Sequence, residues 1–296
     1  MPKSIWINGE LVLPEQATIS VYDHGLLYGD GVFEGIRIYN SRIFKLDTHL
    51  RRLEESAKAI RLNSGYTIDE LTAACKETMA DNGLTDGYIR LVITRGVGNL
   101  GLGPFDCHDP VTFIIADTIQ LYPKELYEKG IRVVTSSVPQ KHPAGLSPRI
   151  KSLNYLNNIL AKMEAHDAGV PEAVMLNHQG FVSECTADNI FIVRPDRITG
   201  APTLTLPPLH AGMLEGVTMN EVMKLAHQAG IAIERADLTR HDLYTAQEMF
   251  VTGSGAEIVP VVECDGRPIN DGTPGQMTQQ LIKLFRELVK ENAPED

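Results

Sequence analysis

The stretch RIKSLNYL, at positions 149–156, decides how this chain of 296 residues is interpreted. Apolar residues continue from it at helical spacing (Leu153, Leu156, Ile159 and Leu160), which predicts a helix that begins just after Lys151. A lysine at a helix entrance is usually solvated, with only its stem buried. A lysine that is desolvated there instead has a lowered pKa, and its neutral amine can form a Schiff base with an aldehyde. This stretch alone leaves both interpretations of Lys151 open.

A second stretch, GFVSE at 180–184, is followed by Asn189-Ile190-Phe191. Together with residues 149–158, it resembles the class IV aminotransferases, which use pyridoxal 5'-phosphate, and the resemblance extends over nearly the whole chain. It implies an α+β protein with the two-domain fold type IV, similar to D-amino acid aminotransferase. It also implies that Lys151 is the catalytic lysine and that Glu184 pairs with the pyridine nitrogen of the cofactor. A carboxylate there keeps that nitrogen protonated, and the protonated ring accepts the charge of the substrate carbanion.

Length and composition agree with a globular enzyme of two domains. Apolar residues make up 43% and charged residues 22% of the chain, which is ordinary for such a protein. We expect an N-terminal α/β domain at 1–118, a linker at 119–130 and a cofactor-binding domain at 131–296. The net charge of −11, without a cluster of Lys or Arg, argues against a nucleic-acid partner.

Nothing in the sequence indicates a membrane or an oxidising compartment. No stretch is long and apolar enough to span a bilayer, and the first residues lack the apolar core of a signal peptide. The four cysteines are far apart in the sequence and lack metal-binding spacing. We therefore expect free thiols, no metal and a cytoplasmic location.

The first strands are predicted from turn signals. Asn8-Gly9 lies between two short apolar runs at 5–7 and 11–13, which predicts a hairpin. The glycine-rich stretch 24–39 alone indicates a loop that leads into a strand. Its FEGIR run at 33–37, however, resembles the branched-chain amino acid aminotransferases. This resemblance implies that the substrate side chain is surrounded by Tyr28, Phe33, Gly35 and Arg37.

Two helices are predicted next. Asp47 is expected to cap the first, with the apolar stripe Leu50, Leu53, Ala57 and Ile60. Arg52 lies off this stripe, in an Arg-Leu-x-x-Ser-Ala pattern whose arginine binds the cofactor phosphate in the family. A guanidinium fork suits a phosphate. Thr67 and Glu70 form a capping box for the second helix.

A strand at 87–95 follows, with Tyr88, Arg90 and Val92 on one face and apolar residues on the other. The pattern fits both a wet edge strand and a strand that lines a cleft. The resemblance implies that Tyr88 and Arg90 meet substrate carboxylates. The run GVGNLG at 96–101 matches a dinucleotide-binding pattern, but the Leu-Gly-Pro that follows it cannot open the required helix, so we disfavour that interpretation.

The second half holds the remaining cofactor residues that the resemblance implies. A helix that begins near Val217 and Thr218 offers backbone N–H groups for a phosphate. The family usually has arginine after this threonine, whereas this chain has Met219. Ser254 is the counterpart of a phosphate-binding hydroxyl residue, and the amides of Gly255 and Ala256 face the substrate carboxylate. Tyr155 is expected beside the phenolic oxygen of the cofactor.

These residues predict a branched-chain-amino-acid transaminase. It would transfer the amino group of L-leucine, L-isoleucine or L-valine to 2-oxoglutarate, and the resemblance implies a homodimer. A D-amino acid or (R)-amine aminotransferase shares the fold, but the Arg-x-His carboxylate trap of the D-amino acid enzymes is absent from the loop after residue 95. An aminodeoxychorismate lyase usually has arginine where this chain has Tyr155. Substrate breadth and the choice between Arg37 and Arg90 as the partner of the second carboxylate stay open.

Overall fold

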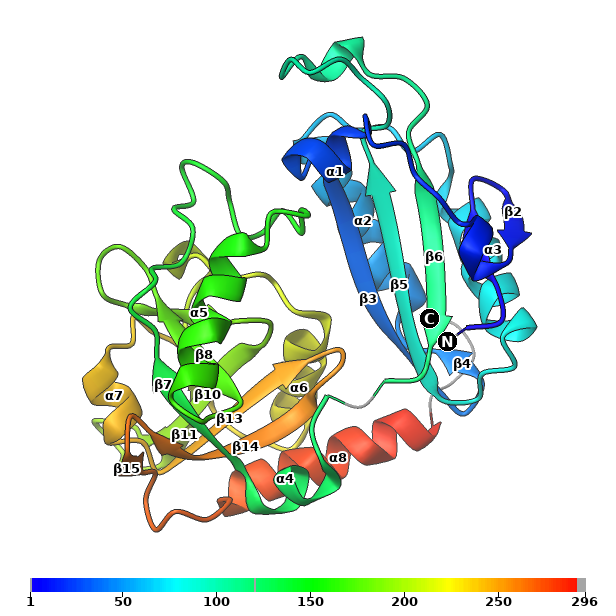
Figure 1. Cartoon of the computed structure of the whole chain (residues 1–296). Coiled ribbons are helices and arrows are strands. Elements are labelled where there is room, and N and C mark those ends of the chain that lie inside the picture. Colours follow the sequence, from blue (N-terminus) through cyan, green and yellow to red (C-terminus); the bar gives the residue numbers. More distant parts are fainter. Residues whose placement is uncertain (1, 120, 292–296) are drawn as a thin grey trace. The chain divides into compact units, whose positions relative to one another are not determined.

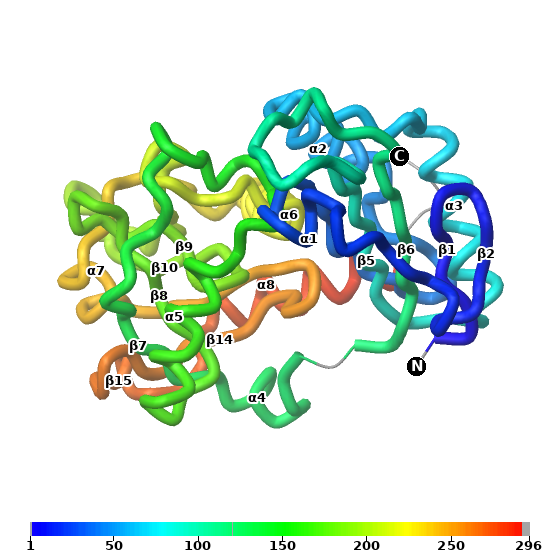
Figure 2. Tube along the Cα trace, turned by 45° about the horizontal axis from the view of Figure 1, so that its top comes forward, coloured from blue at the N-terminus to red at the C-terminus, as the bar shows by residue number. Residues whose placement is uncertain are grey.

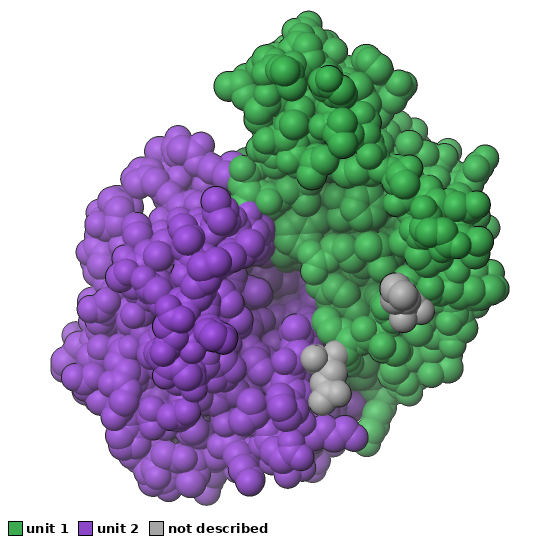
Figure 3. Space-filling model, viewed as in Figure 1, with its two compact units in different colours: residues 1–119, 150–154, 289–296 green, residues 120–149, 155–288 purple. Residues whose placement is uncertain are grey.

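Two compact units make up the computed structural model, which describes residues 2–119 and 121–291. Unit 1 comprises residues 1–119, 150–154 and 289–296, and unit 2 comprises 120–149 and 155–288 (Figure 3). The short segment 150–154, which carries Lys151, therefore belongs to unit 1 although its neighbours in sequence belong to unit 2. Compactness does not establish that a unit folds alone, so the domains at 1–118 and 131–296 and the linker at 119–130 stay a prediction.

Unit 1 contains a six-stranded antiparallel sheet in the order β2-β1-β6-β5-β3-β4. Its strands are β1 Ile5–Ile7, β2 Glu10–Val12, β3 Gly31–Tyr39, β4 Arg42–Ile43, β5 Gly87–Thr94 and β6 Thr112–Asp117. Helices α2 (Leu46–Ala59) and α3 (Ile68–Asp81) cover one face of the sheet (Figure 1). The predicted hairpin at Asn8-Gly9 is confirmed as β1–β2, which lies at the sheet edge (Figure 2).

Successive side chains of β3 and β5 point to opposite faces of the sheet. One face packs into the core, and the other carries the residues that were predicted to bind the substrate. Strand β5 turns Ile89, Leu91 and Ile93 into the core, and all three are nearly inaccessible to solvent. Its other face carries Tyr88 and Arg90, as predicted, and the antiparallel register places them beside Arg37 and Gly35 of β3. The sheet therefore presents the predicted substrate residues of β3 and β5 on the face opposite the helices.

Helix α2 begins one residue earlier than its predicted cap. Its N-cap is Lys45, in a left-handed conformation with φ 52°, and Asp47 lies in the first turn. Asp47 still favours the helix, because a carboxylate near the N-terminus complements the helix dipole. The capping box of α3 is confirmed: the Glu70 N–H donates to Thr67 Oγ1 at 3.3 Å, and the Thr67 N–H donates to Glu70 Oε2 at 2.7 Å.

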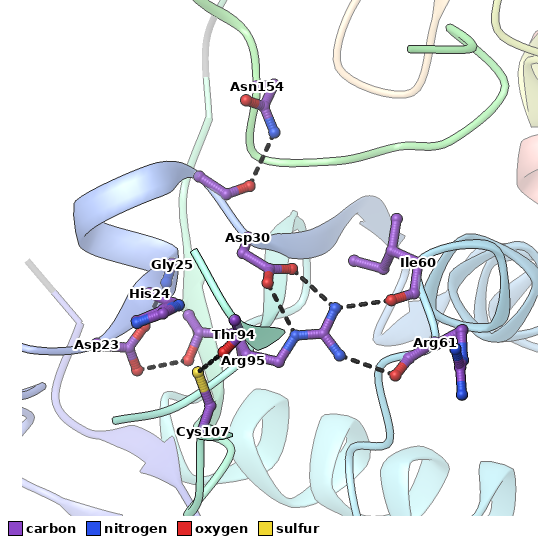
Figure 4. Close-up of polar contacts among 12 residues, drawn as sticks. Asp23, His24, Gly25, Asp30, Ile60, Arg61, Thr94, Arg95, Cys107 and Asn154 are labelled. Atoms are coloured by element: carbon purple, nitrogen blue, oxygen red, sulfur yellow. Dashed lines mark hydrogen bonds and ion pairs between the residues drawn. The ribbon is translucent and has the colours of Figure 1, made fainter. Parts of the chain in front are cut away.

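The glycine-rich stretch before β3 contains a short helix, α1 (His24–Tyr28), where the pattern alone had indicated only a loop. The Asp23 carboxylate starts it by accepting the Gly25 N–H at 2.7 Å, and also accepts the Thr94 hydroxyl at 2.7 Å (Figure 4). Gly29, at φ 70°, ends it in the left-handed conformation that glycine adopts without strain.

The run GVGNLG opens no long helix, which agrees with the rejection of a dinucleotide site. Only a 3-10 turn, Pro104–Asp106, occurs before β6. The buried Arg95 at its start forms a two-pronged ion pair with Asp30, with both N–O distances at 2.9 Å. It also donates to the carbonyl groups of Ile60 and Arg61 (Figure 4). Arg95 thus ties the start of this loop to the end of α2.

Unit 2 contains a nine-stranded mixed sheet in the order β12-β11-β10-β13-β14-β7-β8-β9, with β15 paired to β14. Its strands are β7 Ile131–Thr135, β8 Glu172–Leu176, β9 Val182–Cys185, β10 Asn189–Pro195, β11 Pro202–Leu206, β12 Ile233–Arg235, β13 Glu248–Gly253, β14 Glu257–Cys264 and β15 Arg267–Pro268. Its helices include α4 Lys124–Lys129, α5 Leu156–Asp167, α6 Val217–Gln228 and α7 Arg240–Tyr244; α8 Gln276–Glu291 extends into residues of unit 1 (Figure 1). No helix of the described residues is long and apolar enough to cross a membrane.

Helix α5 is present, but its apolar stripe faces outward. The residues that it buries are Asn158, Ala161 and Ala165. Three of the apolar residues that predicted the helix, together with Met163, are between 44% and 67% exposed: Leu156, Ile159, Leu160 and Met163. Since a monomeric protein rarely exposes a contiguous apolar patch, this face is a candidate interaction surface.

Candidate active site

Two main-chain hydrogen bonds and one bond to a serine side chain hold Lys151 and its neighbours against the rest of unit 1. The Phe33 N–H donates to the Lys151 carbonyl oxygen at 3.0 Å, and the Leu153 N–H donates to that of Gly31 at 2.9 Å. The Lys151 N–H donates to Ser56 Oγ at 3.1 Å. Lys151 therefore lies in an extended segment along β3, five residues before α5, rather than at the helix entrance.

Phe33 brings the lysine amine and an arginine to one aromatic ring. Lys151 Nζ lies 4.6 Å from the ring centroid of Phe33, and the guanidinium carbon of Arg90 lies 4.7 Å from the same centroid. Arg90 Nη2 also lies 3.4 Å from the Tyr88 hydroxyl oxygen. A methyl group at Gly35 would lie 1.7 Å from that hydroxyl, so only glycine lets the Tyr88 ring cross β3 here.

The other two predicted substrate residues of unit 1 are Arg37 and Tyr28. The guanidinium of Arg37 lies 4.8 Å from the centroid of the Tyr39 ring, and Arg37 is the register partner of Tyr88. Tyr28 is at the end of α1, where its hydroxyl donates to the Leu100 carbonyl oxygen at 2.6 Å. Tyr28 therefore contacts the loop after β5.

Arg52, the predicted phosphate ligand, is held by a buried carboxylate. Its Nε donates to Glu34 Oε1 at 2.7 Å, and its Nη2 donates to Glu34 Oε2 at 2.8 Å. His49 Nδ1 lies 2.8 Å from the same Oε2. Glu34 is fully buried, whereas the Arg52 side chain keeps 12% of its surface exposed. The pair thus fixes the direction of the guanidinium fork and leaves its edge accessible.

The charges of this trio follow from burial and from one another. Burial alone would raise the pKa of Glu34, but the Arg52 guanidinium and His49 outweigh it and hold that pKa far below its usual range. Burial lowers the pKa of His49, although the Glu34 carboxylate opposes this shift. We therefore assign an ionised Glu34 and a neutral His49 at neutral pH.

No sequence pattern had indicated Glu34, His49 or Ser56 as residues of the site. Glu34 could have been predicted from the alternation of residues along β3, because it lies on the same core-facing side of the strand as Val32 and Ile36. A carboxylate on a buried face requires a cation, which the next helix supplies. His49, Arg52 and Ser56 follow one another at spacings of three and four residues along α2, so they lie on one side of it.

In unit 2, Glu184 lies on β9 opposite Met175 of β8 and is 7% exposed. Its Oε1 accepts a hydrogen bond from Gln140 Nε2 at 2.6 Å. Its Oε2 accepts the Leu214 N–H at 2.9 Å. Glu184 is thus a buried carboxylate with a neutral donor on each oxygen, and Gln140 is a further residue that the sequence analysis missed.

The N-terminus of α6 supplies the predicted anion-binding amides. Gly216 is its N-cap, and Val217 and Thr218 in its first turn are buried. The first N–H groups of a helix have no partner within it, so they can bind an anion. A side chain at Gly216 would clash with Asn189, whose Oδ1 would lie 2.0 Å from the added carbon. Met219, which replaces the usual arginine, is fully buried.

The last predicted residues lie on two other segments of unit 2. Ser254, Gly255 and Ala256 form the turn between β13 and β14, which ends at Glu257 in a left-handed conformation with φ 62°. Tyr155 precedes α5, and its ring centroid lies 5.1 Å from Lys141 Nζ. Burial lowers the pKa of Lys141, while Glu184 opposes that shift.

These groups suit an aldehyde-bearing pyridine phosphate better than a metal. The described residues include no cluster of three or more His, Cys, Asp or Glu that could hold an ion. They do include a lysine anchored beside an aromatic ring, a buried carboxylate with neutral donors, an arginine fork and a helix N-terminus with a buried threonine. An amine, a counter-ion for a ring nitrogen and two kinds of phosphate donor are the groups that pyridoxal 5'-phosphate requires.

Comparisons with known proteins agree with this chemistry. The family model described as amino-transferase class IV matches residues 31–264. The putative branched-chain-amino-acid aminotransferase of Methanocaldococcus jannaschii is 48% identical over 284 residues, which cover 96% of each chain. The crystal structure of the Escherichia coli branched-chain amino acid aminotransferase matches with a TM-score of 0.94 at 34% identity, covering 100% of this chain and 97% of that one.

A third match is the branched-chain amino acid aminotransferase of Thermobaculum terrenum, whose crystal structure contains pyridoxal 5'-phosphate. It has a TM-score of 0.87 at 33% identity and covers 99% of this chain and 95% of that one. The predicted α+β fold type IV is therefore confirmed. This chain belongs to the class IV aminotransferases and, within them, to the branched-chain amino acid aminotransferases.

Proposed function

We propose that this enzyme transfers the amino group of L-leucine, L-isoleucine or L-valine to 2-oxoglutarate. The observation that carries the proposal is the shared contact of Lys151 Nζ and the Arg90 guanidinium with the Phe33 ring. Transamination in both directions requires one site to accept an apolar side chain and, in turn, a second carboxylate. Aromatic surface suits the first, and an adjacent arginine suits the second, because an unpaired buried carboxylate would cost several kcal/mol.

Pyridoxal 5'-phosphate is the cofactor of this family. When bound, it takes up the amino group and spreads the negative charge of the substrate α-carbon over its ring. We assign to Lys151 the binding of its aldehyde carbon and the movement of the α-proton. Glu184 would hold the proton on the ring nitrogen, and Tyr155 would face the phenolic oxygen.

The phosphate and substrate assignments rest on the donors described above. Arg52, the amides of Val217 and Thr218, and the Ser254 hydroxyl would bind the phosphate. The amides of Gly255 and Ala256 would face the substrate α-carboxylate. Tyr28, Phe33, Gly35, Arg37, Tyr88 and Arg90 would line the substrate side chain.

We also propose a homodimer in the cytoplasm. The exposed apolar stripe of α5 supports an interface between copies, since a second copy would remove Leu156, Ile159 and Leu160 from water. All four cysteines are free thiols, and three of them are buried. Free thiols support a reducing compartment.

Incubation with single amino donors tests the substrate assignment. The purified enzyme is mixed with 2-oxoglutarate and L-leucine, and L-glutamate is measured. We expect rapid glutamate formation with L-leucine, L-isoleucine and L-valine, and little product with an (R)-amine. D-alanine is tested with 2-oxoglutarate as acceptor, and pyruvate is measured. Faster turnover of D-alanine than of L-leucine would overturn the proposal in favour of a D-amino acid aminotransferase.

A further inference from the structure

Gln140 donates the shortest of the hydrogen bonds described for the Glu184 carboxylate. It precedes α5 by sixteen positions in sequence, in the loop after β7, and is 3% exposed. Its Nε2 donates to Glu184 Oε1 at 2.6 Å, and its main-chain N–H donates to the Leu176 carbonyl oxygen at 2.8 Å. Both ends of the residue are therefore attached to the β8–β9 hairpin that carries Glu184.

The orientation of the Gln140 amide is fixed by a second contact. Its Oε1 accepts the Lys141 main-chain N–H at 2.8 Å, and Asn157 Nδ2 lies 3.5 Å from the same oxygen. A flipped amide would place its NH2 group against these donors and its oxygen against the carboxylate. The network therefore requires the NH2 group to face Glu184.

We infer that Gln140 is a positioning residue that biases a shared proton from Glu184 toward the ring nitrogen of the cofactor. The inference rests on the proposed role of Glu184 as the partner of that nitrogen. One proton can reside on the nitrogen, giving a charged pair, or on the carboxyl, giving a neutral pair. A neutral donor on Glu184 stabilises the carboxylate and so favours the charged pair.

The size of this bias follows from the strength of one buried bond. Removing a hydrogen bond to a charged group should change the proton distribution by roughly tenfold to hundredfold. The Leu214 N–H, at 2.9 Å from Oε2, contributes in the same direction, and Asn189 Nδ2 lies further from that oxygen, at 3.5 Å. Because the Leu214 donor is main chain, whereas Gln140 donates from its side chain, Gln140 is a close neutral donor that a substitution can remove.

The test is nitrogen NMR of the holoenzyme loaded with pyridoxal 5'-phosphate labelled with 15N in the ring. The ring-nitrogen chemical shift reports protonation directly and does not require turnover. We expect the signal of the unmodified protein to lie at the protonated position, and that of Gln140→Met to move toward the unprotonated position by a population change of at least tenfold. Gln179→Met, in the exposed turn between β8 and β9, is the matched control and should leave the signal unchanged.

A second variant keeps the inference testable if Gln140→Met does not fold. Gln140→Leu removes the amide donor and introduces no charge, with a branched apolar side chain in place of the straight chain of methionine. We therefore expect its ring-nitrogen signal to move toward the unprotonated position, in the same direction as that of Gln140→Met.

The outcomes separate this inference from the proposed function. A ring nitrogen that is unprotonated in the unmodified protein would overturn the role of Glu184, and with it the premise. A protonated nitrogen that neither Gln140 variant shifts would overturn the inference alone. Loss of thermal stability or of cofactor affinity without a change in the nitrogen signal would assign Gln140 a purely structural role. That result would also overturn the inference.

Discussion

Phe33 and Lys151 are joined through both their main chains and their side chains. The Phe33 N–H donates to the Lys151 carbonyl oxygen at 3.0 Å, while Lys151 Nζ lies 4.6 Å from the centre of the Phe33 ring. The first contact fixes the backbone of the lysine, and the second limits the directions that its amine can take. This double attachment places the amine on the same face of the sheet as Arg90.

Replacing Lys151 by alanine should remove the group that binds the cofactor aldehyde and moves the α-proton. We expect loss of the visible absorption of the bound cofactor, and turnover lower by at least about 10²–10⁴-fold, the range that a positioned proton-transfer group supplies. Absorption spectra and glutamate formation measure both. Lys58→Ala, on the exposed side of α2, is the control. Undiminished turnover of Lys151→Ala would contradict its assignment.

Arg90→Met should separate the two half-reactions. The guanidinium beside the Phe33 ring is the proposed partner of the second carboxylate, so single turnover with L-glutamate should fall much more than single turnover with L-leucine. Stopped-flow absorbance of the cofactor follows each reaction. Arg37→Met is the comparison: a selective loss there, and none in Arg90→Met, would transfer the role to Arg37. Equal losses for both substrates would indicate that Arg90 holds the shared α-carboxylate or supports the fold.

Glu34→Ala should destabilise the protein as well as release Arg52. Removing one partner of a buried ion pair costs about 3–5 kcal/mol, because the other charge stays buried without its counter-ion. Urea unfolding of the cofactor-free protein measures the loss. Glu54→Ala, on the exposed side of α2, the helix that carries Arg52, should change the free energy of unfolding by less than about 0.5 kcal/mol. A similarly small change for Glu34→Ala would refute the importance of the Glu34–Arg52 pair.

Acid should destabilise the cofactor-free protein in two steps. His49 has a lowered pKa in the folded protein, so below its ordinary value of 6.5 the unfolded chain takes up a proton that the folded protein does not, and stability falls. Glu34 also has a lowered pKa, so its contribution is present above the ordinary value of 4.5 and is lost only as the pH falls toward its folded pKa.

Melting temperatures between pH 7.5 and 5 test the first step. We expect the melting temperature to fall over this range, and to fall less steeply in His49→Gln, which cannot titrate. Identical slopes for the two proteins would show that His49 is protonated in the folded state or does not govern this range.

Leu160→Asp should disrupt the proposed homodimer. The exposed stripe of α5 would place this residue against a second copy, where a buried, unpaired carboxylate is unfavourable. Sedimentation velocity should show a shift from dimer toward monomer. Ile198→Asp is the control, because Ile198 is 95% exposed and isolated on a turn. A Leu160→Asp variant that sediments as the unmodified protein does would exclude α5 from the interface.

Local patterns predicted much of the fold. The capping box at Thr67 and the alternation of Ile89, Leu91 and Ile93 each depend on residues close in sequence, and both are confirmed. The start of α2 was missed because Lys45 takes a left-handed conformation, which a lysine rarely adopts and which no local preference indicates. The outward stripe of α5 was not foreseen either, since periodicity gives the spacing of apolar residues but not the partner that they face.

The polar contacts of the site were harder to predict. Glu34 and Arg52 are 18 residues apart, and Gln140 and Glu184 are 44 residues apart, so their pairing depends on how strands and helices pack. The family resemblance identified Arg52 and Glu184 as site residues. It did not identify the side chains that orient them. Those partners follow only from the three-dimensional arrangement.

The attachment of residues 150–154 to β3 has a consequence for synthesis of the chain. Strand β4 pairs with the end of β3 at Ile38 and Tyr39, and the edge near Gly31 and Phe33 is covered by the segment that carries Lys151. On the ribosome, the first 119 residues emerge before this segment. Until it arrives, the nascent protein presents an uncovered strand edge, which is a template for misassembly with other chains. Lys151 thus belongs to the segment that covers this strand edge in the folded protein.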